Sequence, residues 1–209
     1  MKKEIRIYIE GDTKNKGKNT DITLRQGFNA FFRELIEEAK NKNTTLRPIT
    51  YGSKFETFKK FLDGVREYQD SFVLFLLDSD APLEENETPK AFLKKQNPAW
   101  HLHDVEENQC HLMVHLMEAW FYTDKDKLAE YYGKDFNRNA LVRNTNVEKI
   151  PKADVENGLA NATRNTQKGE YHKTRHGAKI LELINPQFVC NAAPNCKRLF
   201  EIVQEKLKN

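Results

Sequence analysis

The stretch that decides the fold is SFVLFLLDSDAP, residues Ser71–Pro82. Six apolar residues, Phe72–Leu77, run without interruption into Asp78, Ser79 and Asp80. A continuous apolar run of this length is typical of a strand that is covered on both faces, as in a parallel sheet. Two aspartates at the end of such a strand repel each other, which does not stabilise the protein. They either end the strand or bind a cation.

The segments before this strand alternate between strand and helix patterns. Apolar and polar residues alternate from Ile5 to Ile9, which predicts a strand that ends at Glu10. Apolar residues at helical spacing predict helices at 21–42 and 53–68, on either side of a short strand at 44–52. This β-α-β-α-β order predicts a parallel sheet with right-handed crossovers. A short helix is also expected near Thr88–Lys95.

A fourth apolar stretch, CHLMVHLMEAWFYTD at 110–124, fits two different structures. One is a strand across His111–His115, followed by a helix that begins near Met117. The other is a single helix from Cys110 to Tyr122, because periodicity alone does not separate a strand from a helix in a short apolar run. We favour the strand.

The two structures differ in what they imply for the pattern HxxxHxxE. On a single helix, His111, His115 and Glu118 would share one face and could grip zinc. On a strand, the two histidines would lie roughly 13 Å apart, too far to share an ion. In that case Glu118 begins the following helix.

Beyond residue 124 the pattern is mainly helical. Helices are predicted at 124–133, 152–164, 176–184 and 194–208. The chain is therefore expected to form an α/β domain at 1–123 and a helical C-terminal extension at 124–209, packed together as one unit.

Composition restricts the class of protein. Of the 209 residues, 31% are charged and 38% are apolar, which is typical of a globular chain. The net charge of +3 is compatible with nucleic-acid binding but does not indicate it. The longest apolar run is far shorter than the ~20 residues of a membrane span, so no membrane association is expected. Three cysteines without CxxC spacing predict reduced thiols in a cytoplasmic protein.

Acidic residues follow two of the predicted strands. Glu10 closes the first strand, and Asp78 and Asp80 close the third. Because ligands bind at the carboxyl ends of parallel strands, these carboxylates are expected to gather at one edge of the sheet. Carboxylate oxygens are ligands for Mg²⁺ or Mn²⁺. The alternative is that Asp78 caps a turn and Glu10 is exposed to solvent, and the residues alone leave both interpretations open.

Basic residues gather in KGEYHKTRHGAK, at 168–179. Basic groups mixed with an aromatic one, here Tyr171, are typical of contacts with a phosphate backbone. Lys173 and His176 would then neutralise the scissile phosphate or the leaving oxygen. The alternative is a solvated helix start with His176 partly buried. Lysines in the loop at 11–20 could also hold substrate beside the acidic edge.

The stretches IYIEGD and LFLLDSDAP together resemble the Toprim pattern, a Glu after the first strand and DxD after a later one. Toprim domains occur in topoisomerases, bacterial primases and OLD-type nucleases; they bind Mg²⁺ through these residues and act on phosphodiesters. The stretches HLMVHLMEAWF and KGEYHKTRHGAKILELINP resemble a family of bacterial Toprim-like proteins. Members of that family are commonly encoded beside an AAA- or ABC-type ATPase and are distantly RloB-like. The resemblance covers nearly the whole chain.

The resemblance implies a role for each residue that matches the motifs. Glu10 corresponds to the Toprim glutamate, a general base or metal ligand, and Asp78 and Asp80 correspond to the DxD ligands. Glu118 lies where related nucleases place a further acidic residue, and a Toprim sheet needs a fourth strand just before it.

The implied function is that of a Mg²⁺- or Mn²⁺-dependent endonuclease that acts on DNA or RNA, tRNA included. It would be the effector of an anti-phage defence system with a partner ATPase. The alternative is a non-catalytic partner of such an ATPase, whose acidic edge binds metal or nucleotide while it regulates the ATPase. Self-association into a homo-oligomer is left open.

Overall fold

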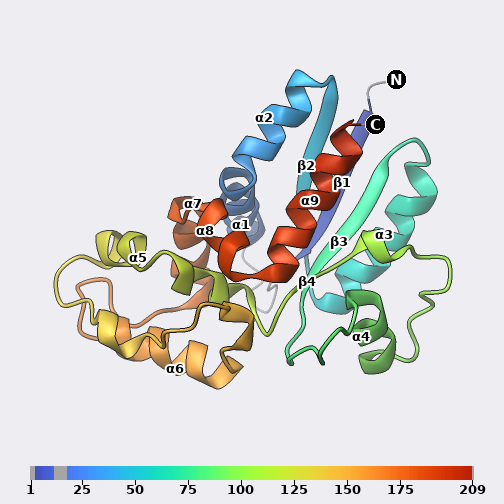
Figure 1. Cartoon of the computed structure of the whole chain (residues 1–209). Helices are drawn as coiled ribbons and strands as arrows, with labels where there is room; N and C mark the ends of the chain where they lie inside the picture. The colour runs from blue at the N-terminus through green and yellow to red at the C-terminus, as the bar shows by residue number, and fades with distance from the viewer. Residues whose placement is uncertain (1–2, 12–17, 209) are drawn as a thin grey trace.

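The computed structural model describes residues 3–11 and 18–208, so most of the loop predicted to hold substrate lies outside the described residues. Within the described residues the strands form one four-stranded, all-parallel sheet in the order β2-β1-β3-β4 (Figure 1). The strands are β1 (Lys3–Glu10), β2 (Thr44–Tyr51), β3 (Phe72–Asp78) and β4 (Cys110–Met113). The predicted α/β fold with a parallel sheet is confirmed.

Both faces of the sheet are covered, which explains the unbroken apolar run in β3. Leu74 and Leu76 enter one core and Phe75 and Leu77 the other, because successive strand residues point to opposite faces. The helices that cover the first face are α1 (Lys18–Phe31), α2 (Arg33–Asn41) and α9 (Pro194–Lys208). The second face is covered by α3 (Lys54–Glu67) and α4 (Pro89–Gln96).

The helix predicted at 21–42 is two helices that meet at Phe32. The backbone hydrogen bonds continue through this residue, from Phe32 N to Phe28 O and from Ile36 N to Phe32 O, both 2.9 Å. Adjacent residues of a regular helix do not share a face. Phe31 and Phe32 are nevertheless both buried, and both rings contact Phe200 on α9. Tertiary packing of these rings accounts for the local distortion.

The chain at 110–123 is the favoured strand followed by a helix, and the single-helix alternative is wrong. The strand is shorter than predicted, because β4 ends at Met113 rather than His115. After β4 the backbone binds the chain that follows β3: Ser79 N donates to Met113 O and Asp80 N donates to His115 O. His115 takes a left-handed conformation (φ 61°), which ends the strand. The helix that follows, η2 (Met117–Thr123), is a 3₁₀-helix.

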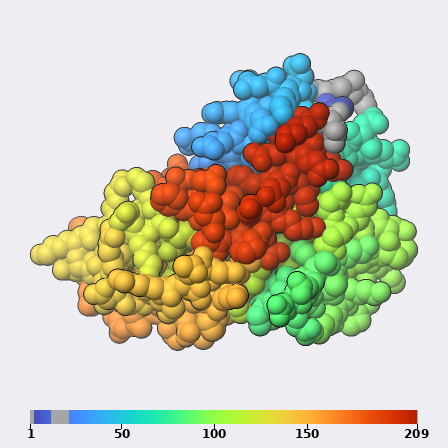
Figure 2. Space-filling model, viewed as in Figure 1, coloured from blue at the N-terminus to red at the C-terminus, as the bar shows by residue number. Residues whose placement is uncertain are grey.

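The helical C-terminal part shares the larger core with the sheet. Its elements are α5 (Lys125–Tyr132), α6 (Lys152–Thr163), a π-helical turn at Lys173–Gly177 that continues into α7 (Ala178–Leu183), α8 (Pro186–Ala192) and α9. Sequence reasoning missed α8, although Asn185 caps it and Pro186 begins it. Figure 2 shows the C-terminal residues, in red, lying across the middle of this face of the molecule.

All three cysteines are buried and free. A search of the described helices finds none with the length and apolar character that a membrane span requires.

Candidate functional site

A cavity of about 700 Å³ lies at the carboxyl ends of β1 and β3. Its wall also includes residues of η2, of α6 and of the segment before the π-helical turn. Among the described residues, six carboxyl groups but only two lysines line it. The acidic residues are Glu10, Asp78, Asp80, Glu118, Glu156 and Glu170, and the lysines are Lys152 and Lys173. The cavity therefore carries an excess of negative charge.

Asp78 is the centre of the site and is buried at the end of β3. Its Oδ1 accepts the backbone N–H of Met117 at 2.8 Å, and its Oδ2 lies 3.1 Å from Lys173 Nζ. Its own backbone N–H donates to Glu10 Oε2 at 3.2 Å. One residue thus joins β1, β3, the start of η2 and Lys173.

Glu118 enters the same cluster from the first turn of η2 and is 3% exposed. Its Oε1 accepts a hydrogen bond of 2.8 Å from the Tyr171 hydroxyl. Its Oε2 lies 3.8 Å from Lys173 Nζ, and among the described residues this buried oxygen has no hydrogen-bond partner. Burial raises the pKa of Glu118 above its ordinary value, even though the charge of Lys173 acts in the opposite direction.

Burial and mutual repulsion also act on Glu10. Burial, reinforced by the negative charge of Asp78, raises the pKa of Glu10 to about 7. Burial alone would lower the pKa of Lys173, but the charges of Asp78 and Glu118 outweigh it and raise that pKa. Lys173 thus pairs with Asp78 and Glu118, and the charge of Lys54, followed by that of Lys173, acts on Glu10. The carboxyl groups still outnumber the ammonium groups, and the cluster can accommodate more positive charge.

Asp80 lines the cavity but is bound differently from the other predicted ligands. It takes a left-handed conformation (φ 61°), and its carboxylate lies 2.5 Å from Lys54 Nζ and 2.8 Å from Lys152 Nζ. Burial would raise the pKa of Asp80, but the two lysines outweigh burial and lower it. The structure thus joins Glu10 to Asp78, and Lys173 pairs with both Asp78 and Glu118. Asp80 lies instead between two other cations.

His176, predicted to contact phosphate, does not line the cavity. It is buried, and the centroid of its ring lies 5.7 Å from that of Tyr132 and 6.1 Å from that of Tyr171. Its Nδ1 accepts the backbone N–H of His172 at 3.0 Å. His176 therefore holds the π-helical turn that carries Lys173, and the interpretation of it as a buried residue matches its surroundings.

The histidines of the HxxxHxxE pattern lie in different environments. His111, on β4, has its Nε2 2.9 Å from Asn108 O and its Nδ1 3.3 Å from Arg198. Burial and the charge of Arg198 lower the pKa of His111 to about 3, so the ring is neutral. His115 lies beyond the end of the strand in a left-handed conformation. The zinc site that the single helix would have formed is not present in this arrangement.

Two contributors to the site were not predicted from the sequence. Ser79, between the aspartates, accepts the backbone N–H of His115 at 2.7 Å and donates to Ala81 O at 2.5 Å, which fixes the turn after β3. Its position between the two aspartates of the DSD motif was the only sequence signal for this role. Lys152 comes from α6, 72 residues after Asp80 in the chain, and no local pattern could have paired the two.

The acidic cluster, formed by Glu10, Asp78 and Glu118, fits a divalent cation that keeps part of its water shell. In the part of the chain that the structure describes, no three histidine, cysteine or carboxylate side chains stand close enough together to hold a metal ion. Mg²⁺, however, is usually bound by one or two carboxylates together with water and substrate phosphate. Asp78 with Glu10 or Glu118 meets that requirement, and Glu118 Oε2, which accepts no hydrogen bond from the described residues, fits a cation.

Comparison with known proteins gives one match. The model of the family described as "Domain of unknown function (DUF4276)" matches residues 9–204, which is nearly the whole chain and includes every residue of the acidic cluster. No curated protein and no solved structure matches the chain. The chain therefore belongs to the DUF4276 family.

Proposed function

We propose that the protein is a metal-dependent phosphodiesterase, an endonuclease that acts on DNA or RNA, tRNA included. One observation carries the proposal. Carboxyl groups from β1, β3 and η2 line one cavity of about 700 Å³, where Lys173 pairs with Asp78 and Glu118 and the backbone of Asp78 binds Glu10. Buried carboxylates are costly unless cations neutralise them, so this arrangement supports a site that takes up further positive charge.

Asp78, together with Glu10 or Glu118, would hold the Mg²⁺ or Mn²⁺. When bound, such an ion aligns the phosphodiester, lowers the pKa of an attacking water and stabilises the leaving oxygen. Asp80 would act indirectly, because Lys54 and Lys152 already bind its carboxylate.

The remaining steps belong to side chains of this protein. Glu10, at the cavity wall beside Asp78, would accept the proton of the attacking water. Lys173 would neutralise the negative charge that develops on the phosphate or the leaving oxygen. Tyr171 holds Glu118 through its hydroxyl, and His176 holds the turn from which Lys173 projects.

The test is cleavage of plasmid DNA, single-stranded DNA and tRNA by the purified protein, with Mg²⁺ or Mn²⁺ and with EDTA. Asp78→Ala and Glu10→Ala should abolish cleavage. Glu156→Ala is the matched control, because Glu156 is an exposed carboxylate on the α6 wall of the same cavity. Cleavage that survives both Asp78→Ala and Glu10→Ala would contradict the proposed site.

A second candidate function is favoured by Lys173 itself. Its ammonium already lies against Asp78 and Glu118, so the cluster is partly neutralised without any metal. This supports a non-catalytic protein whose acidic cavity binds metal or nucleotide while it regulates an AAA- or ABC-type ATPase. It predicts no cleavage with any of the substrates above, and an affinity for the ATPase that changes when metal or nucleotide is added. The role in anti-phage defence rests on the resemblance alone and is proposed with the nuclease activity.

A further inference from the structure

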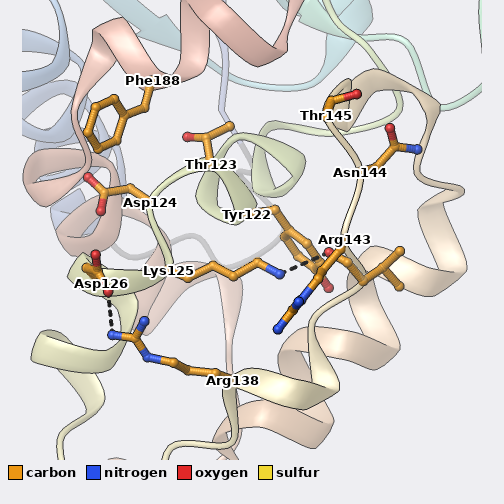
Figure 3. Close-up of a pocket in the computed structure, with 11 residues that line it drawn as sticks. Tyr122, Thr123, Asp124, Lys125, Asp126, Arg138, Arg143, Asn144, Thr145 and Phe188 are labelled. Atoms are coloured by element: carbon orange, nitrogen blue, oxygen red, sulfur yellow. Dashed lines mark hydrogen bonds and ion pairs between the residues drawn. The ribbon is translucent and has the colours of Figure 1, made fainter.

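A second cavity, of about 570 Å³, lies at the other end of η2 from the acidic site (Figure 3). Glu118, near the start of η2, lines the acidic cavity, whereas Tyr122 and Thr123 at its end line the second one. The rest of the wall comes from the start of α5, from the loop at 138–145 and from Phe188 on α8. A volume of this size suits a small ligand.

Two cations in this wall lack a carboxylate partner. Lys125 Nζ donates to the backbone carbonyls of Leu141 and Val142, at 3.0 and 3.1 Å. Within the described part of the chain, neither Lys125 nor Arg143 forms an ion pair. Burial, and after it the nearby charge of Arg143, lowers the pKa of Lys125. The two like charges therefore repel each other, and an anion between them would relieve that repulsion.

The acidic residues of the same wall do not compensate these cations. Asp126 is paired with Arg138 at 2.5 Å. Asp124 accepts two backbone N–H groups, from Lys127 at 3.2 Å and from Asn185 at 3.0 Å. Figure 3 shows Asp126 directed toward Arg138, apart from the Lys125 and Arg143 side chains.

Apolar side chains line the same cavity as the cations. Phe188 is 48% exposed and Val142 is 41% exposed, and both line the cavity. Single-stranded nucleic-acid sites combine exposed aromatic rings, on which bases stack, with basic groups that bind the phosphates. Asn144 adds a polar group: its Oδ1 accepts the N–H of Asn146, which leaves its amide NH₂ to donate to a ligand.

We propose that this second cavity binds a nucleoside phosphate, with the phosphate between Lys125 and Arg143 and the base against Phe188. The ligand would be either a free mononucleotide or one nucleotide of a single strand. The strand is favoured if the proposed nuclease function holds. Glu118 in the acidic cavity and Tyr122 in the second cavity are four residues apart on a 3₁₀-helix, which corresponds to roughly 8 Å along the helix. About two stacked nucleotides of a strand span that distance.

The test is binding in EDTA, so that no cleavage takes place. The probes are fluorescently labelled single-stranded DNA and RNA of about ten nucleotides, with AMP as competitor, and the readout is fluorescence anisotropy. Arg143→Ala and Phe188→Ala should each weaken binding at least about fivefold. The matched controls are Arg164→Ala and Phe55→Ala, which remove exposed residues of the same types outside both cavities.

The outcomes separate the sources of the ligand. Competition by AMP that depends on Arg143 and Phe188 indicates a mononucleotide site. Oligonucleotide binding that depends on both residues, and that AMP does not displace, indicates one nucleotide of a single strand. Oligonucleotide binding that is unchanged in both variants would overturn the proposal. A protein that binds poly-glutamate but none of the nucleotide probes would overturn it as well. Because binding is measured in EDTA, where no cleavage takes place, this test can succeed or fail independently of the cleavage test.

Discussion

Lys173→Met removes the one ammonium group that faces the buried carboxyls of Asp78 and Glu118. These two side chains are 10% and 4% exposed, so little water replaces the lost cation. Breaking a buried ion pair from one side costs about 3–5 kcal/mol. Because the Lys173 side chain is itself 38% exposed, we expect a smaller loss of about 2–3 kcal/mol in the free energy of unfolding. For a chain of this size that is a fall in Tm of roughly 4–12 °C.

The loss should depend on pH in a definite direction. Without Lys173, the pKa of Glu118 in the folded state rises further above its unfolded value. Ionisation of a carboxyl with a raised pKa costs stability as the pH rises through that pKa, so the penalty should be larger near about pH 8 than near about pH 5. The assay is urea denaturation at both pH values in EDTA.

Lys152→Met is the matched control from the same cavity. Lys152 also pairs with an aspartate, but Asp80 is 52% exposed, and a pair of that kind contributes less than about 1 kcal/mol. If Lys173→Met costs no more than Lys152→Met near pH 8, the cluster around Lys173 does not carry the excess of buried negative charge that the structure indicates.

Three further changes test other parts of the structure. Glu10→Gln should make the metal-free protein more stable than the wild type above pH 7, by up to about 3 kcal/mol. The reason is that the raised pKa of Glu10 makes its ionisation costly in the folded state, so the variant and the wild type should be equally stable near pH 4. Urea denaturation across this range checks the sign. Tyr171→Phe should cost about 1–3 kcal/mol by leaving Glu118 Oε1 without its donor, and a loss below 0.5 kcal/mol in thermal denaturation would contradict it. Gly27→Ala should lower the free energy of unfolding by about 1–3 kcal/mol, because the added Cβ would lie 2.7 Å from the backbone oxygen of Ala178. A Tm equal to that of the wild type would contradict this close packing of α1 against α7.

Much of the fold could be predicted from local patterns. The apolar run Phe72–Leu77 and the alternation from Ile5 to Ile9 each determine a strand, and the order of strands and helices then determines a parallel sheet. Details set by distant contacts could not be predicted. Phe32, where α1 and α2 meet, packs on Phe200, more than 160 residues away in the chain. The chain after β4 bonds to the chain after β3, which no local pattern indicates.

The candidate site divides in the same way. Glu10 and Asp78 were predicted to meet because both end strands of one sheet, and the structure does place them together. The partners of the acidic residues follow from tertiary packing instead. Lys152 on α6 binds Asp80, whereas Lys173 binds Asp78, and only the folded chain shows which lysine neutralises which carboxylate. His176 illustrates the limit of composition, because a histidine in a basic segment can as readily pack among tyrosines.

The most direct test of the central claim is anomalous diffraction from crystals of the protein soaked in Mn²⁺. We predict one or two peaks in the acidic cavity, within ligand distance of Asp78 and of Glu10 or Glu118, and their loss in Asp78→Ala crystals. A cavity without a peak, with Lys173 still bound to Asp78 at saturating Mn²⁺, would contradict the proposal that this site holds a catalytic metal ion.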